Sequence, residues 1–195
     1  MTGDAPEAVV IGASAGALEA LSVILPLLPA RYPLPVLIVV HIPPDKKSIL
    51  ADLFQAKCRV AVREAEDKEP ISAGTIYFAP ADYHLLVEPD KSLSLSADEP
   101  VLYSRPSLDV LFESAADAYG PGLIAIVLTG ANQDGAYGLK AVHEAGGKTI
   151  VQRPQAAYAS AMPEAAIAQC PDAEILSLEG ISAYLQNIGT PGLRL

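Results

Sequence analysis

The chain has 195 residues, of which 51% are hydrophobic and 18% are charged, and this composition excludes an intrinsically disordered protein. Its 13 basic and 23 acidic residues give a formal net charge of −10, so we expect no nucleic-acid partner, which would need a basic surface. The two cysteines, Cys58 and Cys170, lack zinc-ligand spacing, so we expect neither a disulfide framework nor a metal site.

The N-terminal part of the chain predicts a strand, a glycine-rich turn and a helix. Residues 1–7 are acidic, unlike the basic start of a signal peptide, and glycines, a glutamate and a proline interrupt the apolar stretch 9–29. We therefore expect a protein of the reducing cytoplasm without membrane insertion. Residues 8–11 predict the strand, and leucines at spacings of three and four predict one buried helix face, made by Leu18, Leu21, Leu25 and Leu28.

A second buried strand is predicted at residues 36–40, which are all apolar. Such a run is typical of a strand that is covered on both faces in a parallel sheet. The strand ends at His41, and Pro43-Pro44-Asp45 predicts a turn before a helix near residues 47–57.

The middle of the chain has shorter predicted elements. Residues 59–62 and 75–79 predict short strands, and residues 83–87 and 93–96 alternate as in an antiparallel hairpin. Ser107 begins a predicted helix with an acidic first turn, and its apolar face consists of Leu108, Leu111, Phe112 and Ala115.

The last third returns to strands that alternate with helices. Residues 123–128 predict a buried strand, followed by helix 138–144, strand 149–151, helix 163–169, strand 175–178 and a helix near Ile181. This alternation predicts one α/β domain over residues 1–195. Its fold is a doubly wound, mostly parallel, Rossmann-like sheet with helices on both faces and an inserted antiparallel β-hairpin. In such folds ligands bind at the carboxyl ends of the strands.

Ser14 lies in the turn after the first strand, within Gly12-Ala13-Ser14-Ala15-Gly16. This segment matches the pattern G-x-S-x-G, in which small residues permit a sharp turn that exposes a nucleophilic hydroxyl. The alternative interpretation is a glycine-rich turn in which Ser14 only caps the following helix.

His41 and Asp134 follow two other buried strands. If the first two strands are neighbours, His41 can approach Ser14 and act as its general base. A carboxylate at position 134 can orient the imidazole and stabilise its charged form. Each residue also has a simpler interpretation, since a histidine can bond to a loop and an aspartate before a glycine is common in turns.

Several ordered motifs together resemble the catalytic domain of the chemotaxis protein-glutamate methylesterases, the CheB type. The resemblance covers residues 9 to about 185. It is carried by Val10–Gly16, Val40-His41-Ile42-Pro43, Tyr77–Leu85, Arg105–Phe112, Leu128-Thr129-Gly130, Asp134-Gly135-Ala136 and Met162–Ile167.

The resemblance implies a serine esterase without a cofactor. Members of the family hydrolyse γ-glutamyl methyl esters on chemoreceptors, and some also deamidate glutamine. By matching motif, Ser14 is the nucleophile, His41 the base and then the acid, and Asp134 the orienting carboxylate. The family places a backbone donor for the oxyanion near Ala131, and Ala15 is the supporting position beside the nucleophile.

The chain departs from the family at several positions near these motifs. Ala15 replaces threonine, Ala17 replaces glycine, and Ala131-Asn132 replaces methionine and glycine. Backbone N–H donation survives the change at Ala131, and we expect Asn132 to keep the loop shape because asparagine tolerates a positive φ.

The family typically has a receiver domain before the catalytic domain, and only seven residues precede the first strand here. The expectation is a catalytic domain without a receiver domain. Its substrate would be a methylated chemoreceptor-like protein, and a separate receiver or methyltransferase protein would be a further binding partner.

Two other functions remain open from the residues. A dinucleotide-binding domain would have a third glycine and an acidic residue at the end of the second strand, where this chain has Ala17 and His41. A non-catalytic signalling or binding module on the same fold is compatible with the alanines at positions 15, 17 and 131. We expect His84 to pack in a loop or lie at the surface, and His143 to be solvated.

Overall fold

The computed structural model describes residues 5–41 and 49–188, so the predicted turn at 43–45 and the predicted helix start at 47 lie outside these ranges. The strands are β1 (Ala8–Ala13), β2 (Val36–Val40), β3 (Ala61–Glu64), β4 (Thr75–Phe78), β5 (His84–Val87), β6 (Leu93–Ser96), β7 (Leu123–Val127), β8 (Lys148–Gln152) and β9 (Glu174–Leu176). The α-helices are α1 (Ala17–Ile24), α2 (Leu50–Gln55), α3 (Leu108–Tyr119), α4 (Ala136–Glu144), α5 (Ala161–Gln169) and α6 (Leu178–Gln186). Short 3-10 helices are η1 (Leu25–Leu27), η2 (Gly120–Gly122) and η3 (Pro154–Ala156).

The predicted α/β fold is confirmed. Seven strands form one sheet in the order β3-β4-β2-β1-β7-β8-β9, and every neighbouring pair is parallel. The predicted hairpin is a separate antiparallel sheet of β5 and β6. From β1 the chain builds one side of the sheet and then returns to build the other from β7. The strand order therefore reverses at β1, and the crevice beyond the carboxyl ends of β1 and β7 is the expected ligand site.

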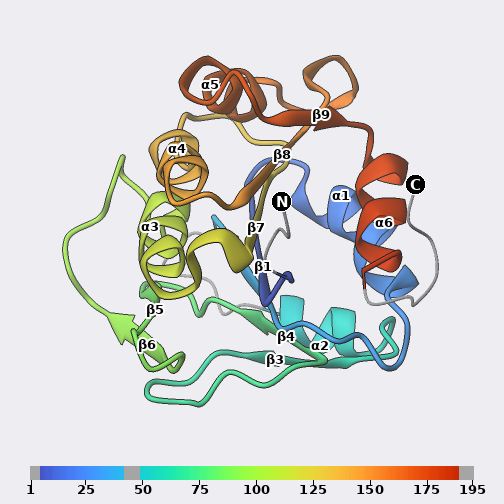
Figure 1. Ribbon diagram of the computed structural model, residues 1–195, viewed down its shortest axis with the longest axis vertical. Helices are drawn as coiled ribbons and strands as arrows, with labels where there is room; N and C mark the ends of the chain where they lie inside the picture. The colour runs from blue at the N-terminus through green and yellow to red at the C-terminus, as the bar shows by residue number, and fades with distance from the viewer. Residues whose placement is uncertain (1–4, 42–48, 189–195) are drawn as a thin grey trace.

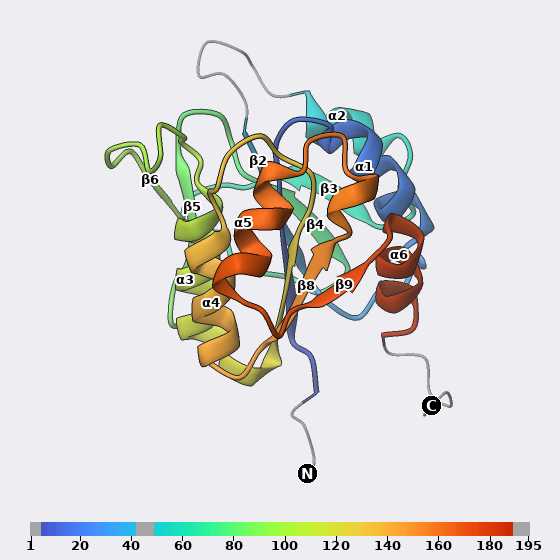
Figure 2. The same ribbon diagram turned by 90° about the horizontal axis from the view of Figure 1, so that it is seen from above.

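Helices cover both faces of the sheet (Figures 1 and 2). Helices α3, α4 and α5 lie on one face together with the hairpin, and α1, α2 and α6 lie on the other. The central strands β1, β2 and β7 are completely buried, as their uninterrupted apolar sequences predicted. Among the described residues, no helix is both long and apolar enough to cross a membrane.

The predicted buried face of the first helix is wrong at Leu18, which is 43% exposed. The helix instead turns Ala17, Leu21 and Ile24 toward the sheet, together with the small Ala20. These residues lie on one side of a 3.6-residue turn, whereas Leu18 points more than a quarter turn away. The leucines at 25 and 28 are buried, but they belong to the 3-10 turn and the residue after it.

Helices α3 and α4 pack closely at Gly138, and this contact predicts the effect of a side chain there. A Cβ atom at Gly138 would lie 2.7 Å from Phe112 Cβ and 3.0 Å from Asp109 Cα. Because overpacking costs about 1–3 kcal/mol and alanine favours a helix over glycine by about 1 kcal/mol, we expect Gly138→Ala to lower the free energy of unfolding by up to about 2 kcal/mol.

Gly180 in α6 is the matched control, because a Cβ atom there would be 3.4 Å or more from its neighbours. Gly180→Ala should leave the free energy of unfolding unchanged or raise it. Urea denaturation of both variants measures the difference. Equal effects of the two substitutions would contradict the close packing of α3 against α4.

Candidate active site

Ser14 lies directly beyond the carboxyl end of β1, and both glycines around it are required by the packing. A Cβ atom at Gly12 would lie 2.0 Å from Leu108 Cδ2. Gly16 has a φ of +83° and precedes α1, and a Cβ atom there would lie 2.6 Å from Tyr158 Cβ. The N-cap residue of α1 is Gly16, and no side chain caps this end of the helix. The interpretation of Ser14 as a simple helix cap is therefore wrong.

His41 lies next to Ser14, because each follows one of two paired strands. Strands β1 and β2 are paired in register up to Ala13 and Val40, and the His41 N–H donates to the Ala13 carbonyl oxygen at 3.2 Å. Ser14 and His41 are thus the first residues beyond the same end of the paired strands. The Ser14 N–H donates to the Thr129 carbonyl oxygen at 2.9 Å. Within the described ranges, the Ser14 hydroxyl makes no hydrogen bond, so it is available to a ligand or to His41.

The structure brings His41 and Asp134 into direct contact. His41 Nε2 lies 2.7 Å from Asp134 Oδ2, and the Asp134 side chain is completely buried. Since an ionised carboxylate only accepts, Nε2 carries the proton and donates it to this hydrogen bond. Nδ1 is then the unprotonated ring nitrogen, which leaves it as the atom that can accept a proton from Ser14.

The Asp134 carboxylate also caps the N-terminus of α3. Its Oδ1 accepts from Ser107 Oγ at 2.8 Å and from the Asp109 N–H at 3.1 Å, and its Oδ2 accepts from the Leu108 N–H at 2.7 Å. Burial raises the pKa of Asp134, but the hydrogen bonds from His41, Leu108, Asp109 and Ser107 outweigh burial, so the pKa lies below its usual range. Asp134 therefore stays ionised beside His41.

Asp109, in the first turn of α3, caps the N-terminus of α4. Its Oδ1 accepts from the Gly135 N–H at 2.9 Å and from the Gly138 N–H at 2.7 Å, at the start of α4. Burial, with the neighbouring charges of Asp134 and Glu113, raises the pKa of Asp109 to about 6, although the two backbone bonds act in the opposite direction. Two buried carboxylates thus connect the starts of α3 and α4 to each other.

Two backbone N–H groups near Ser14 are free to stabilise negative charge. Within residues 5–41 and 49–188, neither the Ala15 N–H nor the Ala131 N–H donates a hydrogen bond. The reason given for Asn132 is wrong, because Asn132 is not among the residues with positive φ. Instead its Oδ1 accepts from the Asp134 N–H at 3.1 Å, which holds the loop by a side-chain bond.

Four residues contribute to this arrangement without having been assigned a role from the sequence. They are Ser107, Asp109, Thr129 and Gln152. Thr129 Oγ1 donates to the Ala15 carbonyl oxygen at 2.8 Å, and the Thr129 N–H donates to Gln152 Oε1 at 2.9 Å. The sequence signal for Ser107 and Asp109 was only that of a helix start, and the only signal at Gln152 is its place directly after the predicted strand 149–151.

The other candidate side chains lie outside the arrangement around Ser14. His84 is buried, and its Nε2 donates to the Glu99 carbonyl oxygen at 3.0 Å while its Nδ1 accepts from the Ser107 N–H, so it packs a loop. His143 is half exposed and lies 3.7 Å from Asp172. Both cysteines are free. In the part of the chain that is described, no three His, Cys, Asp or Glu side chains are grouped to hold a metal ion.

The raised pKa of Asp109 predicts a pH-dependent stability. The folded protein binds a proton at Asp109 near pH 6, whereas an unperturbed aspartate binds it near 3.8, so stability falls as pH rises through this window. Asp109→Asn keeps an acceptor oxygen but does not titrate. We expect the stability of the unaltered protein relative to this variant to fall by on the order of 2 kcal/mol between about pH 4 and pH 7.

Urea unfolding at several pH values measures this difference. Asp117→Asn, an exposed position on the same helix, is the control and should show no such trend. Parallel stability curves for the protein and its Asp109→Asn variant would show that the carboxyl group titrates alike in the folded and unfolded chains.

Comparison with known proteins identifies similar sequences along most of the chain. The family model described as CheB methylesterase matches residues 9–185. A Leptospira interrogans protein named "Putative protein-glutamate methylesterase/protein-glutamine glutaminase" is 46% identical over 176 residues, which are 90% of this chain and 91% of that protein. The protein-glutamate methylesterase/protein-glutamine glutaminase of Archaeoglobus fulgidus is 39% identical over 162 residues, 82% of this chain but only 46% of that protein.

A solved structure has the same fold. The crystal structure of the Thermotoga maritima CheB methylesterase catalytic domain superposes with a TM-score of 0.88 and 32% sequence identity. The match covers 93% of this chain and 98% of that one. The similarity therefore extends over the whole sheet and both helical layers rather than over one motif.

Proposed function

The chain belongs to the CheB methylesterase family, and from this premise we propose that it is a serine hydrolase that demethylates γ-glutamyl methyl esters on a chemoreceptor-like protein. The observation that carries the proposal is the 2.7 Å contact between His41 and Asp134, next to Ser14 at the carboxyl edge of the sheet. Family membership and this geometry both favour acyl transfer. The dinucleotide-binding alternative is discarded because the chain matches a hydrolase family over residues 9–185.

In the proposed acylation step, Ser14 Oγ attacks the ester carbonyl carbon and its proton passes to His41 Nδ1. The ionised Asp134, bonded to Nε2, stabilises the imidazolium that forms. The free N–H groups of Ala15 and Ala131 are the proposed donors to the oxyanion of the tetrahedral intermediate. The bond to the methoxy oxygen then breaks, and His41 returns the proton so that methanol leaves.

In the proposed deacylation step, His41 accepts a proton from a water molecule that attacks the acyl-enzyme. The tetrahedral intermediate collapses when the bond to Ser14 Oγ breaks and Ser14 regains the proton from His41. The products are a glutamate side chain and free enzyme. The same steps with a carboxamide substrate release ammonia, so deamidation of glutamine is a second proposed activity, in line with the names of the relatives.

The proposed substrate is a methylated chemoreceptor-like protein, and a separate receiver or methyltransferase protein is the proposed partner for control. We further propose that the catalytic unit is a single domain of the cytoplasm. The chain spans nearly the full length of the Leptospira relative, but about half the length of the Archaeoglobus one.

The nucleophile is tested by Ser14→Ala. We expect methanol release from a methylated chemoreceptor fragment to fall by on the order of 10⁴- to 10⁶-fold, because the covalent step needs the hydroxyl. Circular dichroism and urea unfolding should show an unaltered fold. Ser72→Ala, an exposed serine ahead of β4, is the matched control and should keep full activity. Turnover by the Ser14 variant at the normal rate would overturn the assignment.

A binding module without catalysis is the second candidate, and the alanines at positions 15, 17 and 131 are the observation in its favour. A fluorophosphonate probe separates the two functions, because it labels only an activated serine. We expect one equivalent of label on Ser14 and loss of that label in His41→Ala. Absence of labelling in the unaltered protein, together with retained binding of the receptor fragment, would favour the binding module.

A further inference from the structure

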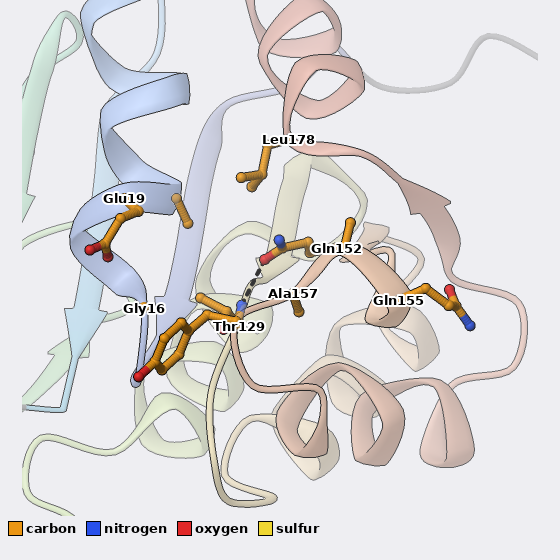
Figure 3. A pocket seen from close by; sticks show the side chains of 10 residues that line it. Gly16, Glu19, Thr129, Gln152, Gln155, Ala157 and Leu178 are labelled. Atoms are coloured by element: carbon orange, nitrogen blue, oxygen red, sulfur yellow. Dashed lines mark hydrogen bonds between the residues drawn. The ribbon is translucent and has the colours of Figure 1, made fainter.

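A pocket of about 280 Å³ lies beside the turn that carries Ser14 (Figure 3). It opens between the start of α1, the end of β8 and the segment that follows β8. Its walls include Gly16, Glu19, Thr129, Gln152, Ala157 and Leu178. None of these six residues has a role in the proposed triad, so the proposed reaction leaves the pocket without an occupant.

Gln152 provides a hydrogen-bond donor at the wall of this pocket. The residue is 1% exposed, and its Oε1 accepts from the Thr129 N–H at 2.9 Å. This bond fixes the orientation of the carboxamide, so the donor atom Nε2 is on the other side. Within residues 5–41 and 49–188 Nε2 has no hydrogen-bond partner, and it is not one of the fully buried atoms without a partner, so it is accessible from the pocket. Figure 3 shows it directed toward the space between Glu19 and Leu178, where it can donate to a ligand that brings an acceptor.

The opposite wall carries a negative charge, which disfavours an anion. Glu19 lies in the first turn of α1 and lines the pocket, and Figure 3 shows its carboxylate directed away from Gln152. Among the described residues, no lysine, arginine or histidine lines the pocket. The alanines at positions 20, 156 and 157 leave room beside the larger Tyr158 and Leu178. The chemistry therefore fits a neutral group that brings an acceptor, such as a carboxamide or a hydroxyl.

Residues that line the pocket also contact the backbone of the turn that carries Ser14. Gly16 is two residues from Ser14, and the carbonyl oxygen of Thr129 accepts the Ser14 N–H at 2.9 Å. Thr129 Oγ1 also bonds to Ala15 at 2.8 Å. The pocket therefore adjoins the turn on which the proposed glutamyl ester would lie.

We propose that this pocket is a specificity subsite that binds a neutral carboxamide or hydroxyl side chain of the substrate protein, close to the glutamyl residue that reacts. The substrate side chain accepts from Gln152 Nε2, and the charge of Glu19 disfavours an acidic side chain at the same position. The inference rests on the proposed function, since it places the scissile ester at Ser14. It adds a selection among methylated glutamyl residues by the chemistry of a neighbouring residue.

The experiment uses short peptides that each contain one γ-glutamyl methyl ester, with Gln, Ser, Leu, Glu or Lys at each flanking position in turn. We expect one position at which Gln or Ser raises kcat/KM at least fivefold over Leu, Glu and Lys. Ala157→Phe fills the pocket without touching the triad, and Ala157 has an extended backbone that accepts phenylalanine. This variant should lose the preference but hydrolyse p-nitrophenyl acetate within twofold of the unaltered protein.

Ala168→Phe, at an exposed position of α5, is the control and should keep the preference. In a second variant, Glu19→Lys, the preference at that position should shift toward Glu. A peptide preference that survives both Ala157→Phe and Glu19→Lys, or no preference at any position, would overturn the subsite. Failure of the proposed function has a different signature, because the unaltered protein would then neither hydrolyse p-nitrophenyl acetate nor react with a fluorophosphonate.

Discussion

The carboxylate of Asp134 is completely buried, and it accepts hydrogen bonds from two distant parts of the chain. One comes from the imidazole of His41 after β2, and three come from residues 107–109 at the start of α3. Burying a charge without such partners is strongly unfavourable, so the fold must bring all these donors to one point. The position of the imidazole and the docking of α3 consequently depend on the same group.

A second buried carboxylate, that of Asp109, caps α4, so α3 and α4 each supply a cap for the other. Asp134 stands just before α4 and caps α3, while Asp109 stands in the first turn of α3 and caps α4. Each helix N-terminus carries partial positive charge, so each carboxylate is favourably placed. The two carboxylates also repel each other, which contributes to the raised pKa of Asp109. Rigidity in this region and the ionised state of Asp134 are therefore linked properties.

The arrangement around Ser14 divides the site between the two faces of the sheet. Asp134 reaches His41 from the face covered by α3 and α4, while the pocket at Gln152 lies near α1 on the other face. Ser14 lies between them, at the strand-order reversal next to β1 and β7. The proposed chemistry and the proposed substrate selection thus lie on either side of the turn that carries Ser14, and Thr129 contacts both.

Most strands and helices, and the edge of the sheet at which the polar residues gather, could be predicted from the order of the amino acids. Uninterrupted apolar runs predicted β1, β2 and β7, because strands covered on both faces cannot alternate. Ser14 and His41 were identified as candidates because they come directly after β1 and β2, and Asp134 because it lies in the loop that follows β7. The buried face of α1 was predicted incorrectly at Leu18. Alanines can also pack against the sheet, and the periodicity of apolar residues alone does not show whether alanines or leucines form the buried face.

Which side chains contact one another depends on how the elements pack in three dimensions. Asp134 caps α3 although it is 26 residues away from Leu108. The Gln152 Nε2 can be assigned as a donor to a ligand only because the Thr129 N–H binds the oxygen of the same carboxamide. Asn132 holds its loop by a side-chain bond instead of a positive φ. Such contacts join residues far apart in the chain, and their energies depend on distance and burial that no local pattern encodes.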